Sequence, residues 1–164
     1  MVKEMYTIIG GVMIFAACSA VGFSAARMYR LRVGQLEAFL RLISHIKAQI
    51  DCFCAPLDSI LDGYESPELS ACGFLFAARE LGADRGFDIC RRRLLLTEDE
   101  ADELSRFFDG LGHHSAGEES SHCAYYEKTL TDALAHERSE LARRTKLCRT
   151  FGMLAGFLLA VLLI

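Results

Sequence analysis

Charged side chains are absent from both ends of this chain and concentrated in its middle. Residues 5–26 and 150–164 carry no charge, whereas residues 27–149 hold 17 of the 18 Lys and Arg and 21 of the 22 Asp and Glu. A helix needs about 20 consecutive apolar residues to cross a bilayer core of about 30 Å. The pattern therefore predicts an N-terminal transmembrane helix (1–26), a polar domain (27–149) and a C-terminal transmembrane helix (150–164).

The two predicted spans differ in length. The first has 22 uncharged residues and the second has 15, which rise only about 22 Å in a helix. The second reaches about 27 Å when it is counted from Leu147 and Arg149 extends its guanidinium toward the interface. A run this short is also typical of a buried core helix. We favour a span because the final residues, FLLAVLLI, offer no polar face to water.

Basic residues flank both apolar runs on the side of the central domain. Cytoplasmic flanks of membrane helices are enriched in Lys and Arg, so we expect the domain in the cytoplasm and both termini outside. The flanking residues after the first run are Arg27, Arg30 and Arg32, and those before the second are Arg143, Arg144, Lys146 and Arg149.

The first run also has features of a secretory signal, with a charged start and small residues around a Phe-Ala-Ala-Cys string that ends at Cys18. A retained span is the better interpretation, because the apolar run continues from Cys18 to Ala26. Cleavage would also expose the six remaining cysteines to an oxidising compartment.

The composition of residues 27–149 excludes some functions. Its 17 positive and 21 negative side chains give a net charge of −4, so no nucleic-acid partner is expected. Its cysteines form no C-x-x-C pair and are interpreted as reduced, small hydrophobic residues. A thiol or metal sensor is a less favoured alternative that rests on these cysteines alone.

Apolar residues recur at helical spacing throughout the middle, and no segment alternates as a strand does. We expect an all-α fold: a cytoplasmic helical bundle whose first and last helices continue the two spans. One stripe lies before Pro56, and another occupies the polar part of a helix running from about residue 118 to residue 164. These stripes are Leu36, Phe39, Leu40, Ile43, Ile46 and Ile50, and Cys123, Tyr126, Leu130, Ala133, Leu134 and Leu141.

Short helices are predicted between the two long ones. One ends at Gly63. The next is capped by Ser66, carries the apolar residues Leu69, Cys72, Phe76 and Leu81, and ends at Gly82. A weak helix is expected over 86–93. Thr97 and Glu100 form a capping box for a helix that ends at Gly112, and 112–121 is predicted to be a loop.

The chain shows no constellation typical of an enzyme, and neither a cofactor nor a metal site is predicted. The adjacent His113 and His114 are better explained as a solvated loop pair than as metal ligands. An acidic turn, consisting of Glu98, Asp99, Glu100, Asp102 and Glu103, complements the dipole at a helix start. The alternative hypothesis is that this acidic turn is a docking surface for a basic partner.

Small residues form ridges on both apolar runs, and such ridges allow close helix packing in lipid. The ridge residues are Ala16 and Ala20 with Ser24 on the first run, and Gly152, Gly156 and Ala160 on the second. The ridges are expected to pack the two spans against each other. Contact with another membrane protein is a compatible alternative.

Several strings, in this order and spacing, resemble the stage III sporulation protein AB family of endospore-forming bacteria. The likeness covers nearly the whole chain. The chain departs from the family in Phe151, where Leu is usual, and in its many cysteines. The strings are Arg32-x-x-Gln35-Leu36; Pro56-Leu57 with Leu61; Phe107-x-x-x-Leu111-Gly112; Ala133-Leu134-x-x-Glu137-x-x-Glu140; and Phe151-Gly152-x-x-x-Gly156-x-Leu158-Leu159-x-x-Leu162-Leu163-Ile164.

The resemblance implies a non-enzymatic component of a secretion-like complex in the mother-cell membrane around the forespore. It also implies a domain similar to the cytoplasmic helical domains of type II secretion F proteins. The implied partners are the lipid bilayer, other sporulation-complex proteins and a secretion-type ATPase, and the number of copies is left open. The residues alone support a generic membrane-tethered adaptor or signalling module equally well.

Overall fold

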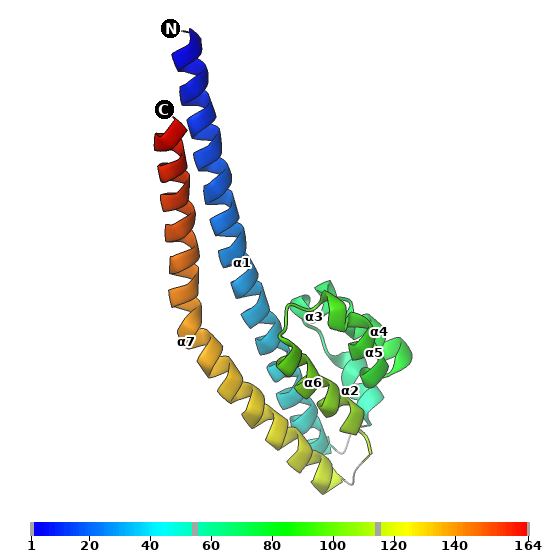
Figure 1. Cartoon of the computed structure of the whole chain (residues 1–164). Helices are drawn as coiled ribbons and strands as arrows, with labels where there is room; N and C mark the ends of the chain where they lie inside the picture. The colour runs from blue at the N-terminus through cyan, green and yellow to red at the C-terminus, as the bar shows by residue number, and fades with distance from the viewer. Residues whose placement is uncertain (1, 54–55, 114–115, 164) are drawn as a thin grey trace. The chain divides into compact units, whose positions relative to one another are not determined.

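The computed structural model describes the backbone of residues 2–53, 56–113 and 116–163. The side chains of 2–9, 11, 12, 14, 58, 116, 144, 156 and 159–163 lie outside this description, as do parts of both predicted spans. All regular structure in the described ranges is helical, which confirms the all-α prediction (Figure 1). The elements are α1 (Val2–Phe53), α2 (Leu57–Gly63), α3 (Pro67–Ala71), α4 (Phe74–Leu81), α5 (Ala83–Cys90), the 3-10 helix η1 (Arg91–Arg93), α6 (Glu98–Gly110) and α7 (Ala116–Leu163).

The chain divides into two compact units. One combines Met1–Leu31 with Glu137–Ile164, and the other is Arg32–His136. Both divisions fall inside the uninterrupted helices α1 and α7, as expected where no proline breaks the chain. Among the described residues, no helix combines the length and apolarity needed to cross a membrane. The two spans and the boundaries at 26 and 149 therefore stay predictions.

An aromatic cluster forms the core of the unit Arg32–His136. Phe39 of α1, Phe74 of α4, Phe87 of α5 and Phe108 of α6 are each at most 2% exposed. The centroid of the Phe74 ring lies 5.3 Å from that of Phe39 and 5.2 Å from that of Phe108, and Phe87 lies 5.3 Å from Phe108. Such ring pairs add about 0.5–1.5 kcal/mol each to the gain from burial. The cluster therefore joins four helices through one set of contacts.

The apolar stripes of the long helices are mostly buried, as predicted. On α1 the buried members are Leu36, Phe39, Ile43 and Ile46, and on α7 they are Cys123, Leu130 and Leu134. The remaining members, Leu40, Ile50, Tyr126, Ala133 and Leu141, are partly exposed.

The helix predicted from Ser66 to Leu81 is broken in two. Ser66 caps α3 as expected, since its side chain accepts a hydrogen bond from the Leu69 backbone N–H. Gly73 then adopts φ +84°, a left-handed conformation that glycine adopts without steric cost, and α4 begins with a new helical phase. The prediction of a single helix is therefore wrong, and two of its apolar residues, Phe76 and Leu81, are 74% and 49% exposed. Phe74, Leu75, Ala77 and Ala78 face the core instead.

Two other boundaries differ from the predictions. The weak helix expected over 86–93 begins at Ala83 and ends at Cys90, followed by the short η1. The loop expected over 112–121 ends earlier, because α7 begins at Ala116. The buried carboxylate of Glu119 accepts a hydrogen bond from the Gly112 backbone N–H at 3.0 Å. This bond ties the first turn of α7 to the start of the connection that follows α6.

Candidate functional site

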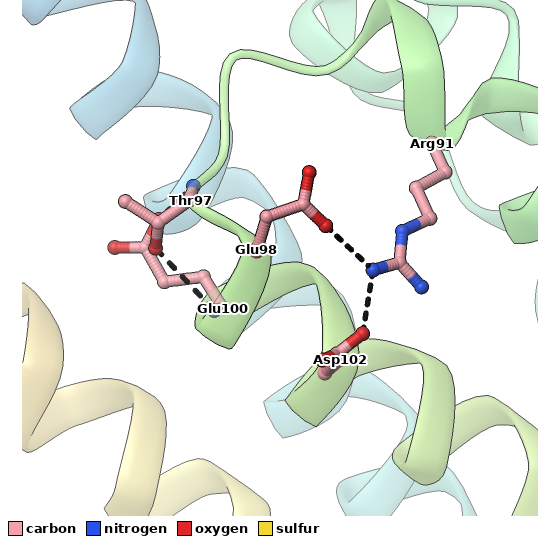
Figure 2. Close-up of polar contacts among 5 residues, drawn as sticks. All are labelled: Arg91, Thr97, Glu98, Glu100 and Asp102. Carbon is pink, nitrogen blue, oxygen red and sulfur yellow. Dashed lines mark hydrogen bonds and ion pairs between the residues drawn. The ribbon is translucent and has the colours of Figure 1, made fainter.

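The start of α6 is built by a reciprocal cap at Thr97. The Thr97 Oγ1 accepts a hydrogen bond from the Glu100 backbone N–H at 3.4 Å, and Glu100 Oε2 accepts one from the Thr97 backbone N–H at 2.8 Å. The predicted capping box is therefore confirmed. Figure 2 shows this cap together with the neighbouring side chains of Glu98 and Asp102.

An arginine from outside α6 neutralises two of these acids. One Arg91 guanidinium nitrogen donates to Glu98 at 3.0 Å and also to Asp102 (Figure 2). Arg91 belongs to η1, so the pairing joins the end of the α5 segment to α6. This role of Arg91 was not predicted from the sequence, although a run of three arginines that begins seven residues before Glu98 is a visible signal.

A second arginine reaches the acidic turn from α1. Arg32 donates to Glu100 Oε1 at 2.9 Å, and the two side chains are only 16% and 12% exposed. Burial tends to raise the pKa of the Glu100 carboxyl, but the hydrogen bonds from Arg32 and Thr97 outweigh it and lower the pKa below its ordinary value. Glu100 is therefore a structural ion-pair partner.

The remaining two acids make no ion pair outside α6 among the described residues. Glu103 accepts from Arg106 of the same helix at 3.1 Å, and the Arg106 side chain is 63% exposed. Asp99 is exposed and makes no ion pair or side-chain hydrogen bond among the described residues. Of the five predicted docking residues, only Glu100 is buried in an ion pair, at 12% exposure. Glu98 and Asp102 share Arg91 but stay 92% and 48% exposed. Asp99 is exposed and Glu103 is 31% exposed.

An apolar groove lies beside these two acids and within the unit Arg32–His136. Its volume is about 140 Å³. We call it the α6–α7 groove, and its lining comprises Leu36 of α1, Asp99, Glu100 and Glu103 of α6, and Thr129, Leu130 and Ala133 of α7. Leu36 and Leu130 were predicted from the sequence to be core residues, and no groove was predicted beside them.

Only some of the small residues in the two apolar runs pack as predicted. Within the unit formed by Met1–Leu31 and Glu137–Ile164, a Cβ on Gly22 would lie 2.7 Å from the Cys148 carbonyl oxygen and 3.2 Å from the Gly152 Cα. Gly152 therefore does pack against α1, but against Gly22. Ala16 and Ala20 are exposed, because they lie on the side of α1 opposite Gly22. Gly22 is two residues, or about 200°, from Ala20 around the helix. Gly156 and Ala160 lie outside the described side chains.

The described thiols and imidazoles do not form a reactive cluster. Burial, with a contribution from Glu119, raises the pKa of the Cys123 thiol to about 12, so the thiol stays protonated at neutral pH. No group of three His, Cys, Asp or Glu in the described part of the chain is arranged to hold a metal ion. His113 is exposed, and its neighbour His114 lies outside the description.

These features define an all-helical protein with long continuous helices and an acidic, groove-bearing surface. The model of the family described as Stage III sporulation protein AB (spore_III_AB) matches residues 7–164. Stage III sporulation protein AB of Bacillus subtilis (strain 168) is 25% identical over 170 aligned residues, which cover 97% of this chain and 99% of that protein. No solved structure matches the chain.

The chain therefore belongs to the stage III sporulation protein AB family, as its resemblance predicted. Membership implies a role in stage III of sporulation.

Proposed function

We propose that the protein is a non-enzymatic membrane platform component of a secretion-like complex, required for endospore development between mother cell and forespore. Its expected contacts are the bilayer of the mother-cell membrane around the forespore, other sporulation-complex proteins and a secretion-type ATPase. The observation that carries the proposal is the family match over residues 7–164, on a chain whose uncharged ends bracket a helical unit with its own aromatic core.

The charge distribution supports the membrane part of the proposal. The runs 5–26 and 150–164 contain no Asp, Glu, Lys or Arg, and charge at the centre of a bilayer costs several kcal/mol. Lys and Arg flank both runs on the side of the central domain, as in helices that enter the membrane from the cytoplasm. Two such helices would anchor the central unit at the cytoplasmic face.

The state of two buried ionisable groups and the exposed charge on α6 support assembly, and not catalysis, as the output. The buried carboxylate at Glu100 is held by ion pairing, and the buried thiol at Cys123 has a raised pKa. The exposed charge at Asp99 is suited to recognising a basic surface.

Deletion of the gene tests the role in sporulation. The deletion strain is expected to stop after engulfment while vegetative growth stays normal, and the wild-type gene should restore spore yield. Normal spore yield from the deletion strain would contradict the proposal.

Thiol labelling tests the orientation. Gly117→Cys places a cysteine on the exposed start of α7, where a Cβ meets nothing within 4 Å. In a chain without native cysteines, this thiol should resist a membrane-impermeant maleimide in intact cells and react after permeabilisation. Lys3→Cys, on the opposite side, should react in intact cells. Ready labelling at Gly117→Cys before permeabilisation would refute the orientation.

A further inference from the structure

We propose that a hollow on α7 binds an anionic phospholipid, with the headgroup phosphate at Arg143 and Lys146 and an acyl chain along the apolar side chains that follow. This inference rests on the proposed function, because it takes residues 150–164 as a membrane span. It adds the class of lipid and the place on the chain that holds it.

The hollow belongs to the unit formed by Met1–Leu31 and Glu137–Ile164, and its volume is about 400 Å³. The described residues that line it all come from α7 and recur at steps of three and four, so they share one face of the helix. This face rises about 16 Å along the helix axis. We call it the α7 hollow, and its lining is Arg143, Lys146, Leu147, Thr150, Phe151 and Leu154.

Charged and apolar residues occupy opposite ends of the α7 hollow. Arg143 and Lys146 form its N-terminal end, and Phe151 and Leu154 form its C-terminal end, where they are 67% and 58% exposed. The Cα–Cβ bonds of a helix point toward its N-terminus, so the two basic side chains extend away from the apolar end and toward the predicted membrane surface. An anion followed by an apolar chain is the order of a phospholipid in the cytoplasmic leaflet. A free phosphate would leave the apolar end uncovered.

The chain itself provides little negative charge for the two cations. Lys146 makes no ion pair or hydrogen bond within the described part of the chain. Arg143 lies 3.9 Å from Glu140 with its side chain 74% exposed, and such surface pairs are weak. The next described arginine, Arg149, does not line the hollow, and its guanidinium carbon lies 5.6 Å from the centroid of the Phe23 ring of α1. Arg143 and Lys146 are therefore placed to meet an anion from outside the chain.

The net charge of the headgroup decides which lipid is preferred. A zwitterionic headgroup carries its own cation beside the phosphate, whereas an anionic headgroup leaves the phosphate charge for the protein. Two basic side chains near the membrane surface should favour the anionic lipid by on the order of tenfold. The hydroxyl of Thr150, between the two ends of the hollow, is a donor for a phosphate or ester oxygen.

The experiment uses the full chain in lipid bilayers and exploits its lack of tryptophan. Phe151→Trp introduces one indole at the apolar end of the hollow, and bromine on an acyl chain quenches indole fluorescence on contact. The protein is reconstituted in phosphatidylcholine with rising fractions of brominated phosphatidylglycerol or, in a parallel series, brominated phosphatidylcholine. We expect the anionic lipid to bind about tenfold more tightly at the indole. Equal quenching by the two brominated lipids overturns the proposal.

Variants in the Phe151→Trp background locate the headgroup. Arg143→Gln with Lys146→Gln should abolish the preference, whereas Arg143→Lys with Lys146→Arg keeps both charges and should retain it. The matched control, Arg27→Gln with Arg30→Gln, removes the same charge from exposed positions beside the first apolar run and should change nothing. An equal loss of preference in the control would indicate general attraction to an anionic surface, and it would overturn the site.

The same measurement separates this inference from the proposed function. Quenching by both brominated lipids without a preference defeats the lipid site alone, since the indole then lies in the bilayer. No quenching by either lipid places Phe151→Trp outside the bilayer, which defeats the membrane part of the proposed function together with the site.

Discussion

Two glycine-to-alanine substitutions should change stability in opposite directions. Both positions are helical, Gly34 in α1 and Gly86 in α5, so each substitution gains up to about 1 kcal/mol of helix propensity. At Gly34 the new Cβ meets nothing within 4 Å. We therefore expect Gly34→Ala to stabilise the central unit by about 0.5–1 kcal/mol.

At Gly86 the same methyl group has no space. It would lie 2.6 Å from the Ala78 backbone nitrogen and 2.7 Å from the Ala78 Cα, whereas ordinary contact begins at 3.4 Å. Backbone atoms cannot rotate away, so α4 and α5 have to separate and loosen the contacts of Phe74 and Phe87. Overpacking of this kind costs about 1–3 kcal/mol. Taking the upper value and subtracting the propensity gain, we expect a net loss of about 2 kcal/mol.

Chemical denaturation of residues 29–147, which we predict to fold without the spans and without metal, measures both effects by circular dichroism. The two variants should differ by about 3 kcal/mol in the free energy of unfolding. A Gly86→Ala variant as stable as the wild type would refute the close approach of α4 and α5. A destabilised Gly34→Ala variant would refute the reasoning from local space.

Three further predictions concern the same segment. Leu134→Asp buries a carboxylate at a 3% exposed site and should cost about 3–5 kcal/mol in denaturation; a loss below 1 kcal/mol would show that Leu134 is not core. Because the folded pKa of Glu100 lies below its ordinary value of 4.5, its stabilisation is present above that pH and is lost as the pH falls through the folded pKa. Glu100→Gln should flatten this loss in denaturation at successive pH values, and an unchanged slope would refute it. Mass spectrometry after maleimide treatment at neutral pH should find the exposed Cys52 modified and the buried Cys123 intact until unfolding; equal reactivity would contradict the burial.

Helix ends could be read from the sequence because capping acts over a few residues. Ser66 accepts from a backbone N–H three residues ahead, and Thr97 and Glu100 bond each other across the same spacing. The absence of proline likewise predicts the continuity of α1 and α7. The acidic composition of the candidate site was equally visible, since five carboxylates lie within six residues.

Which of those carboxylates are accessible was decided by the tertiary structure. Arg32 lies 68 residues from Glu100 in sequence, and no local pattern announces that pairing. The groove also exists only because residues of α1, α6 and α7 meet around it.

Glycine shows the same division between local and tertiary causes. Gly82 follows the last residue of α4, as predicted from its local role. Gly73 interrupts a stripe that looked continuous, and Gly22 and Gly86 lie where another helix backbone comes within contact distance. The sequence determined where helices can begin and end, because those effects act through neighbouring backbone groups. Only the tertiary structure decided which helix faces meet, because close approach depends on residues that are distant along the chain.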